Sequence, residues 1–178
     1  MRWIAWSDGR FDGLEALARC ALGRSGVVAA TAKREGDGAS PLGAWPVREV
    51  FHRASREPPP ETALPVSAVG ETDGWSDDPA DPAYNRRVVR PHPYGHETLA
   101  REDGLYDLVV VLGYNDDPPA PGRGSAIFLH CARADYAPTE GCVALAKPDL
   151  LRVLARMAPG DVVEVRDAAD RLEPAAPV

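Results

Sequence analysis

Apolar runs and short alternating segments indicate a chain made mostly of β-strands. Leu108–Leu112 (LVVVL) is a continuous apolar run, typical of a central strand buried on both faces. Ala126–His130 (AIFLH) predicts a second buried strand. Val47–Arg53 (VREVFHR) alternates apolar and polar residues, which is the period of a half-buried strand. Shorter strands are expected at Trp3–Trp6 and at Asp161–Val165.

Patterns in the N-terminal and C-terminal parts of the chain also predict strands and a helix. Cys20–Ala30 is rich in small residues and predicts a strand, a glycine turn and a second strand. Leu14–Arg19 before it consists of helix formers and could form a helical turn. Pro148 marks the start of a helix that Pro159-Gly160 ends. The leucines and methionine at helical spacing between them are Leu150, Leu151, Leu154 and Met157. The tail RLEPAAPV is expected to fray.

Proline-rich and glycine-rich segments separate these elements. Lys33–Pro46, Glu57–Pro65 and Tyr114–Gly124 are predicted to be turns or connectors. Trp75–Arg90 is polar and is expected to form an exposed loop. The adjoining Pro91–Asp107 is long, irregular, and rich in polar and aromatic side chains. Such a segment inside a compact domain is more often functional than idle.

Composition supports a mainly β fold with one or two short helices. Eighteen prolines and sixteen glycines in 178 residues favour many short strands over long helices. The length suits a single domain over residues 1–178, and an apolar fraction of 44% predicts a folded chain. The formal net charge of −7 disfavours nucleic-acid binding, which requires a basic surface. No stretch approaches the roughly 20 apolar residues of a membrane span.

The N-terminus and the cysteines limit the choice of compartment and cofactor. MRWIAWSDGRFDG has no apolar core and no cleavage site, so it is not a secretory signal. Either the protein stays in the cytoplasm, or a leader is missing from this sequence. Three cysteines cannot form a full disulfide framework, and neither their spacing nor the four histidines fit a zinc pattern. We expect no metal and no cofactor.

The candidate chemistry lies in the stretch from Gly124 to Leu145. His130 ends an apolar strand, and Cys142 follows twelve positions later in a tight turn. An imidazole beside a thiol can lower the pKa of the thiol and accept its proton. Gly141 lets the backbone turn sharply and directs amide N–H groups toward an oxyanion. On spacing alone a structural role stays open, because buried cysteines are usually small hydrophobes.

Three stretches resemble the L,D-transpeptidase (YkuD) family. His130, a loop and then Thr139-Glu140-Gly141-Cys142 resemble the family's histidine followed by Ser/Thr-His-Gly-Cys. Lys33–Gly43 resembles its T-P-x-G-x-F turn, with Ser40 for Thr and Trp45 for Phe. Gly104–Ser125 resembles the branch with little beyond the catalytic domain. The resemblance spans about residues 20–165.

The resemblance implies a β-sandwich-like domain that acts on peptidoglycan stem peptides. Cys142 would be the acylated nucleophile, and His130 its base, oriented by the backbone carbonyl of Cys131. The amides around Gly141 and Cys142 would form the oxyanion hole. Family members attack the bond after the L-centre of a diamino acid, release the terminal D-residue and pass the acyl group to an amine on a neighbouring stem. Which stem residue is the donor, which amine accepts, and whether cross-links are 3–3 or 1–3 stay open.

The sequence departs from the family motif at two positions and suggests further substrate contacts. Glu140 stands where the commoner motif has His, and Ala144 where Arg or Asn is expected. Glu140 would place a carboxylate near the thiol and raise its pKa. The residues predicted to contact substrate are Thr139, Glu140, Arg133, Tyr84, Asn85, Arg86 and His96, with Glu97 beside His96. For Tyr84-Asn85-Arg86 and His96-Glu97, stabilisation of the loop is the alternative. Arg133 suits a substrate carboxylate, although a solvated loop arginine is an equal alternative.

Other interpretations stay open on the sequence. An L,D-carboxypeptidase would use water in place of the amine, and a non-catalytic cell-wall-binding relative would carry Glu140 as the mark of a decayed site. Cys20 and Cys131 are interpreted as structural, although a disulfide between Cys131 and Cys142 would inactivate the enzyme. A monomer is assumed. A peptidoglycan role would place the protein in the periplasm or cell envelope, which conflicts with the missing signal sequence.

Overall fold

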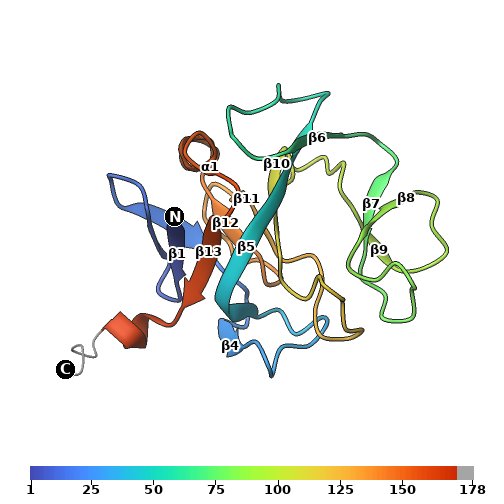
Figure 1. Ribbon diagram of the computed structural model, residues 1–178, viewed down its shortest axis with the longest axis horizontal. Coiled ribbons are helices and arrows are strands. Elements are labelled where there is room, and N and C mark those ends of the chain that lie inside the picture. The colour runs from blue at the N-terminus through green and yellow to red at the C-terminus, as the bar shows by residue number, and fades with distance from the viewer. Residues whose placement is uncertain (172–178) are drawn as a thin grey trace.

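The computed structural model describes residues 1–171 and shows a mainly β protein, as the sequence predicts (Figure 1). These residues form thirteen strands, one α-helix and one 3₁₀ turn, η1 (Ala168–Arg171). Strands β1–β5 are Arg2–Trp6, Arg10–Asp12, Ala18–Ala21, Val27–Ala29 and Ser40–Arg53. Strands β6–β9 are Val66–Val69, Asp73–Ser76, Arg87–Val89 and His96–Thr98. Strands β10–β13 are Leu108–Leu112, Phe128–Cys131, Val143–Leu145 and Val162–Arg166. Except for Arg171, the tail expected to fray lies outside the described residues.

Ten strands form one sheet that closes on itself. The strand order is β10-β11-β12-β3-β2-β1-β13-β5-β4. Strand β6 also pairs with β5, and a further pairing between β10 and β5 closes the sheet. The length of β5, fourteen residues, makes this closure possible. Its part Gly43–Pro46 pairs with β13, and its part Val47–His52 pairs with β10. The strand therefore passes from one side of the fold to the other (Figure 1).

Side chains alternate along the central strands, so each of these strands contributes residues to two separate hydrophobic cores. On β10, Leu108, Val110 and Leu112 point into one core, whereas Val109 and Val111 point into the other. The inner core lies within the closed sheet, and its fully buried members include Trp3, Phe11, Val50, Leu129, Leu145 and Val163. The second core lies on the outer face, with Phe51, Trp75, Leu99, Tyr106, Phe128 and Cys142. Each fully buried large side chain contributes roughly 1.5–3 kcal/mol.

Each core has its own cover. Helix α1 (Lys147–Leu154) begins with Pro148 in its first turn and closes the inner core with Leu150, Val153 and Leu154. A three-stranded sheet, β8-β7-β9, lies apart from the large sheet in Figure 1 and covers the second core. Its Trp75 packs edge-on against Phe128, with ring centroids 5.1 Å apart.

The structure corrects three expectations about local structure. Ser40–Pro46, predicted as part of a turn region, belongs to strand β5, where Pro41 and Gly43 are accommodated in the pairing with β4 and β13. The segment Trp75–Arg90 is not an exposed loop, because Trp75 and Asn85 are buried and hydrogen bonded to each other. No helical turn forms at Leu14–Arg19, whose last two residues start β3.

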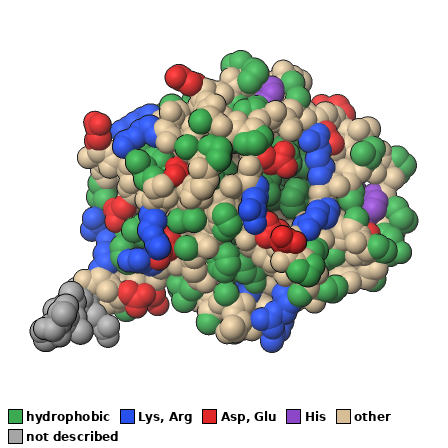
Figure 2. All heavy atoms as spheres, viewed as in Figure 1, with side chains coloured by type: hydrophobic (Ala, Val, Ile, Leu, Met, Phe, Trp, Pro, Cys, Tyr) green, Lys and Arg blue, Asp and Glu red, His purple; other side chains and the backbone are tan. Residues whose placement is uncertain are grey.

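The remaining strand predictions agree with the structure apart from small shifts of their ends. Leu108–Leu112 is β10, the strand predicted at Ala126–His130 runs over Phe128–Cys131, and the last strand is Val162–Arg166. Within residues 1–171, no helix is both long and apolar enough to span a membrane. On the face seen in Figure 2, acidic and basic side chains are interspersed among the described residues.

Candidate active site

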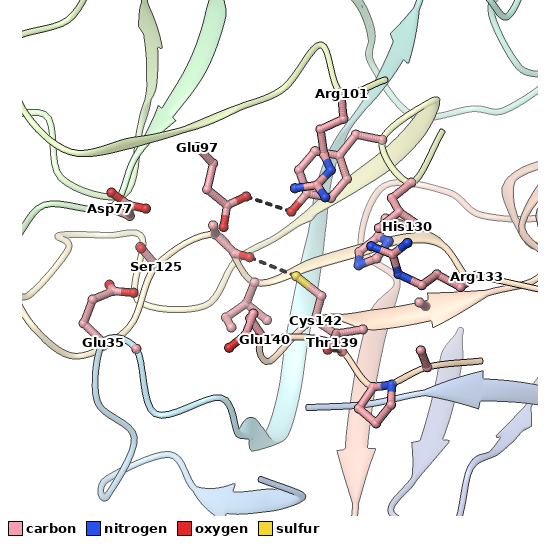
Figure 3. A pocket seen from close by; sticks show the side chains of 18 of the residues that line it. Glu35, Asp77, Glu97, Arg101, Ser125, His130, Arg133, Thr139, Glu140 and Cys142 are labelled. Carbon is pink, nitrogen blue, oxygen red and sulfur yellow. Dashed lines mark hydrogen bonds between the residues drawn. The ribbon is translucent and has the colours of Figure 1, made fainter. Parts of the chain in front are cut away.

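A pocket of about 460 Å³ opens over the edge of the second core and has Cys142 and His130 in its lining. The two residues come from neighbouring parts of the large sheet. His130 lies on β11, and Cys142 directly precedes β12, which runs parallel to β11 with His130 opposite Ala144. Because side chains alternate along strands, Cys142, Ala144 and His130 point to the same face. Figure 3 shows the thiol and the imidazole side by side in this pocket.

The imidazole of His130 is held by the backbone carbonyl of Cys131. Its Nδ1 lies 2.9 Å from that oxygen, so Nδ1 carries the proton and donates it to the bond. This leaves Nε2 as the acceptor in the neutral ring. The ring packs edge-on against Tyr106, with centroids 5.2 Å apart. The carbonyl therefore occupies the orienting position that the resemblance implies for it.

Both groups of the pair are neutral at rest. Burial, followed by the nearby Glu97 carboxylate, raises the pKa of Cys142 to about 12. Burial also lowers the pKa of His130 to about 4. The thiol donates a hydrogen bond to the Ala126 carbonyl at 3.1 Å, and no described hydrogen bond joins it to His130. A nucleophilic role for this thiol would require proton transfer during the reaction rather than a preformed ion pair.

The turn before Cys142 is fixed by close backbone packing. Gly141 has φ +136°, and a Cβ there would lie 2.8 Å from the carbonyl oxygen of Ala39, so only glycine fits. The Oγ of Ser40, fully buried, donates to the Gly141 carbonyl at 2.8 Å and accepts from the Gly23 amide at 2.9 Å. Ser40 is thus the residue through which the upstream motif supports the turn.

Thr139 stabilises the same turn from its other side. Its Oγ1 donates to the Cys142 carbonyl at 2.7 Å and accepts from the Gly141 amide at 3.1 Å. Since the Gly141 amide is engaged in this way, the Cys142 amide is the stronger candidate of the two for an oxyanion contact. Thr139 therefore both lines the pocket and stabilises the turn before Cys142.

Four predicted substrate contacts do not line the pocket: Tyr84, Asn85, Arg86 and His96. Tyr84 and Asn85 are buried, with 2% and 3% of their surface exposed. Arg86 donates to backbone carbonyls of Asn85 and Asp116, and His96 Nδ1 lies 2.7 Å from the Tyr94 carbonyl. These polar groups have partners within the protein, which the sequence could not reveal because most of the partners lie in distant segments.

Asn85 instead positions the backbone next to the thiol. Its Oδ1 accepts from the Ala126 amide at 3.0 Å and from Trp75 Nε1 at 2.9 Å. Ala126 adopts φ +53°, an uncommon value for a residue other than glycine, and its carbonyl accepts the bond from Cys142. A chain of hydrogen bonds therefore links the small sheet, Asn85 and Ala126 to the thiol.

Arg133 and Glu140 do line the pocket, but both have partners of their own. Arg133 lies 3.4 Å from Asp103, and Glu140 is bonded to Arg24 at 2.8 Å with its side chain 73% exposed. Glu97, rather than Glu140, is the carboxylate that raises the pKa of the thiol. The expectation that Glu140 perturbs the thiol is therefore wrong.

The pocket contains charged residues that the sequence did not single out as a group. Arg101 lies with Arg133 and His130 on one side of Cys142 in Figure 3, whereas Glu35, Asp77 and Glu97 lie on the other side together with Ser125. Glu97 is predicted from the sequence as part of the donor wall together with His96, and Glu97 lines the pocket. For Arg101 the only sequence signal is its place in the polar segment Pro91–Asp107.

The cysteines are not arranged for a disulfide. Cys131 points into the inner core, whereas Cys142 belongs to the second core on the opposite face of the sheet. Cys20 also lies in the inner core, where its thiol bonds to the Arg10 carbonyl at 3.3 Å. All three thiols are free. Within residues 1–171, no set of three His, Cys, Asp or Glu side chains is arranged to hold a metal ion.

A buried thiol and an oriented imidazole in one pocket are an arrangement that suits a thiol nucleophile and its base. The model of the L,D-transpeptidase catalytic domain (YkuD) matches residues 2–165, so the chain belongs to this family. The match starts well before residue 20, where the sequence resemblance was placed.

One solved structure was found similar to this chain. It is L,D-transpeptidase 1 of Mycobacterium tuberculosis, at 14% identity and a TM-score of 0.41. The alignment covers 92% of this chain and 60% of that chain, so the chain spans less than two thirds of that structure. A comparison with curated proteins gave no match.

Proposed function

We propose that this chain is a cysteine L,D-transpeptidase that acts on peptidoglycan stem peptides and works as one catalytic domain over residues 1–178. The observation that carries the proposal is the placement of Cys142 and His130 on one face, in the lining of one pocket. Family membership supports the reaction type. Peptidoglycan as the substrate rests on what the family resemblance implies.

The first half of the reaction acylates the thiol. Sγ of Cys142 attacks the carbonyl after the L-centre of the donor's diamino acid while Nε2 of His130 accepts the thiol proton. The tetrahedral intermediate then loses the terminal D-residue, whose amine takes the proton from His130. The product is a thioester on Cys142. The Cys131 carbonyl stabilises the imidazolium that forms briefly, through Nδ1.

The second half transfers the acyl group to an amine. The neutral acceptor amine attacks the thioester and passes a proton to His130 Nε2. The C–S bond of the tetrahedral intermediate then breaks, and His130 gives that proton to the leaving sulfur, which restores the thiol and the neutral imidazole. Water in place of the amine would give an L,D-carboxypeptidase. The intact turn around Gly141 supports catalysis over a purely binding role, because Ser40 and Thr139 still hold it in one conformation.

Covalent labelling by a carbapenem tests the nucleophile. Intact-mass measurement should show one adduct on the native protein and none on Cys142→Ser. Cys20→Ser is the matched control, because it removes a buried thiol outside the pocket and should keep the adduct. An equal adduct on Cys142→Ser would disprove the mechanism.

Incubation with muropeptides tests the second half of the reaction. Cross-linked dimers are expected, whereas trimmed monomers alone would indicate the hydrolase. Binding without turnover, unchanged in Cys142→Ala, would indicate the non-catalytic relative.

A further inference from the structure

One wall of the pocket carries three carboxylates that have no cationic partner among residues 1–171. They belong to Glu35, Asp77 and Glu97, called here the acidic wall. Glu35 accepts a hydrogen bond from Tyr84, and Glu97 accepts one from Tyr106 at 2.7 Å. No hydrogen bond or ion pair with another described residue is found for the Asp77 side chain. The three thus place up to three negative charges in one wall, with only two phenols as partners.

The cations in the same pocket are already paired elsewhere. Lys33 is bonded to Asp37 at 2.7 Å, and Arg101 is bonded to Asp103, with Nε 3.0 Å from Oδ1. Arg133 also faces Asp103. Burial and mutual repulsion consequently raise the pKa of Asp77 and of Glu97 above the usual range for carboxyl groups.

An independent feature also points to a ligand at this wall. The Oγ of Ser125 is buried and has no hydrogen-bond partner among the described residues, while the residue is only 7% exposed. Ser125 lines the pocket and lies between Asp77 and Glu35 in Figure 3. Buried hydroxyls are nearly always hydrogen bonded, so a group from a bound molecule would satisfy this one.

The chemistry of the wall fits an ammonium group better than a metal ion. Among the described residues, no three carboxylates converge closely enough to hold a metal. A primary ammonium has three N–H donors on one centre and can bond to separate acceptors around it. Hydrogen bonds from an ammonium to carboxylates are charge-assisted and are about twice as strong as neutral ones.

The position of the acidic wall relative to His130 decides which amine it serves. In the proposed function His130 hands its proton to the leaving amine and takes one from the attacking amine, so both reacting amines pass on the His130 side. The acidic wall lies on the other side of Cys142 (Figure 3). An amine held there is not the one that reacts.

We propose that Glu35, Asp77, Glu97 and Ser125 form a subsite for the free, protonated side-chain amine of the donor's diamino acid. The inference rests on the proposed function and adds to it a determinant of donor specificity. A donor that lacks this charge would cover three carboxylates that have no cationic partner and would leave the Asp77 carboxylate and the Ser125 hydroxyl without any hydrogen bond to a described residue. Such a donor would therefore bind more weakly.

Binding to the unreactive Cys142→Ala protein tests the subsite. The probes are a stem tetrapeptide with a free side-chain amine and the same peptide acetylated on that amine, each titrated calorimetrically. The free-amine peptide should bind at least about tenfold more tightly. In the same background, Asp77→Asn with Glu97→Gln should reduce this preference to about twofold or less. Glu61→Gln, an exposed carboxylate outside the pocket, should leave the preference intact.

Equal affinity for the two peptides, no measurable binding of either, or a preference that survives the double substitution would overturn the subsite. Carbapenem labelling of Cys142 in the double variant, with Cys142 restored, shows that the fold and the thiol are intact. An adduct on the native protein without amine preference removes the subsite and leaves the proposed function standing. An amine preference without any adduct removes the cysteine mechanism and leaves the subsite standing.

Discussion

Burial of His130 makes the free energy of unfolding depend on pH. Its pKa is lowered from 6.5 to about 4 because burial disfavours the charged ring. Between these values the unfolded chain binds a proton that the folded chain does not. The free energy of unfolding therefore falls as the pH falls through this window. We expect His130 to account for a loss of about 3 kcal/mol between pH 7 and pH 4, measured by urea denaturation.

The variant His130→Gln isolates this contribution from those of other titrating groups. Its stability should fall less steeply over the same pH range, because glutamine does not titrate. Parallel pH profiles for the two proteins would show that His130 does not titrate differently on folding.

Gly141 is the residue at which the backbone leaves no space for a side chain. Gly141→Ala would place a Cβ 2.8 Å from the Ala39 carbonyl oxygen at φ +136°. We expect a loss of about 1–3 kcal/mol in unfolding free energy and strongly slowed carbapenem labelling. Gly122→Ala is the matched control, since Gly122 also has positive φ but a Cβ there would have no atom of the described residues within 4 Å. Equal labelling rates in the two variants would contradict this role for Gly141.

At the scale of elements, strand β5 supports the turn before Cys142 through Ser40. Ser40→Ala would leave the Gly141 carbonyl and the Gly23 amide without their buried partner. The expected cost is about 1–3 kcal/mol, together with slower carbapenem labelling of Cys142. Ser67→Ala, on β6, removes a half-buried hydroxyl far from the turn and should change labelling little. Normal labelling in Ser40→Ala would show that the turn holds without this bond.

Elements formed by continuous apolar runs could be predicted from the sequence, and very short ones could not. Strands β10 and β11 and helix α1 bury enough apolar side chains for their patterns to stand out. Strands such as β8 and β9 have three residues each, too few to show a period. The first half of β5 was hidden because Pro41 and Gly43 are turn formers by local preference, and only its neighbours in the sheet favour a strand.

Some residues of the candidate site could be predicted from the sequence, and others could not. His130 and Cys142 could be paired from sequence because one loop connects two adjacent strands, and the motif residues at Ser40 gave a further signal. Of the acidic wall only Glu97 could be predicted, since Glu35 and Asp77 come from other segments of the chain. Asn85 and Tyr84 looked like exposed loop residues because their partners also lie far away in sequence.

At the scale of the whole molecule, the small sheet forms part of the pocket by covering the second core. Trp75 joins it to that core through Phe51 and Phe128. Trp75→Ala should cost about 3–5 kcal/mol and weaken donor binding, because Asp77 and Glu97 belong to the same sheet region. Thermal unfolding and calorimetry measure the two effects. Val89→Ala, at a site 67% exposed in this sheet, is the control and should alter neither.

Strand β5 also links the unfolding of the two hydrophobic cores. Val50 faces the inner core and the next residue, Phe51, faces the second core, so one backbone segment is shared by both. Neither core can come apart without disturbing this strand or its partner β10. The two cores should therefore behave as a single cooperative unit. In native-state hydrogen exchange, the amides of β5 and β10 would exchange only through global opening, while those of β8 would exchange through local fluctuations.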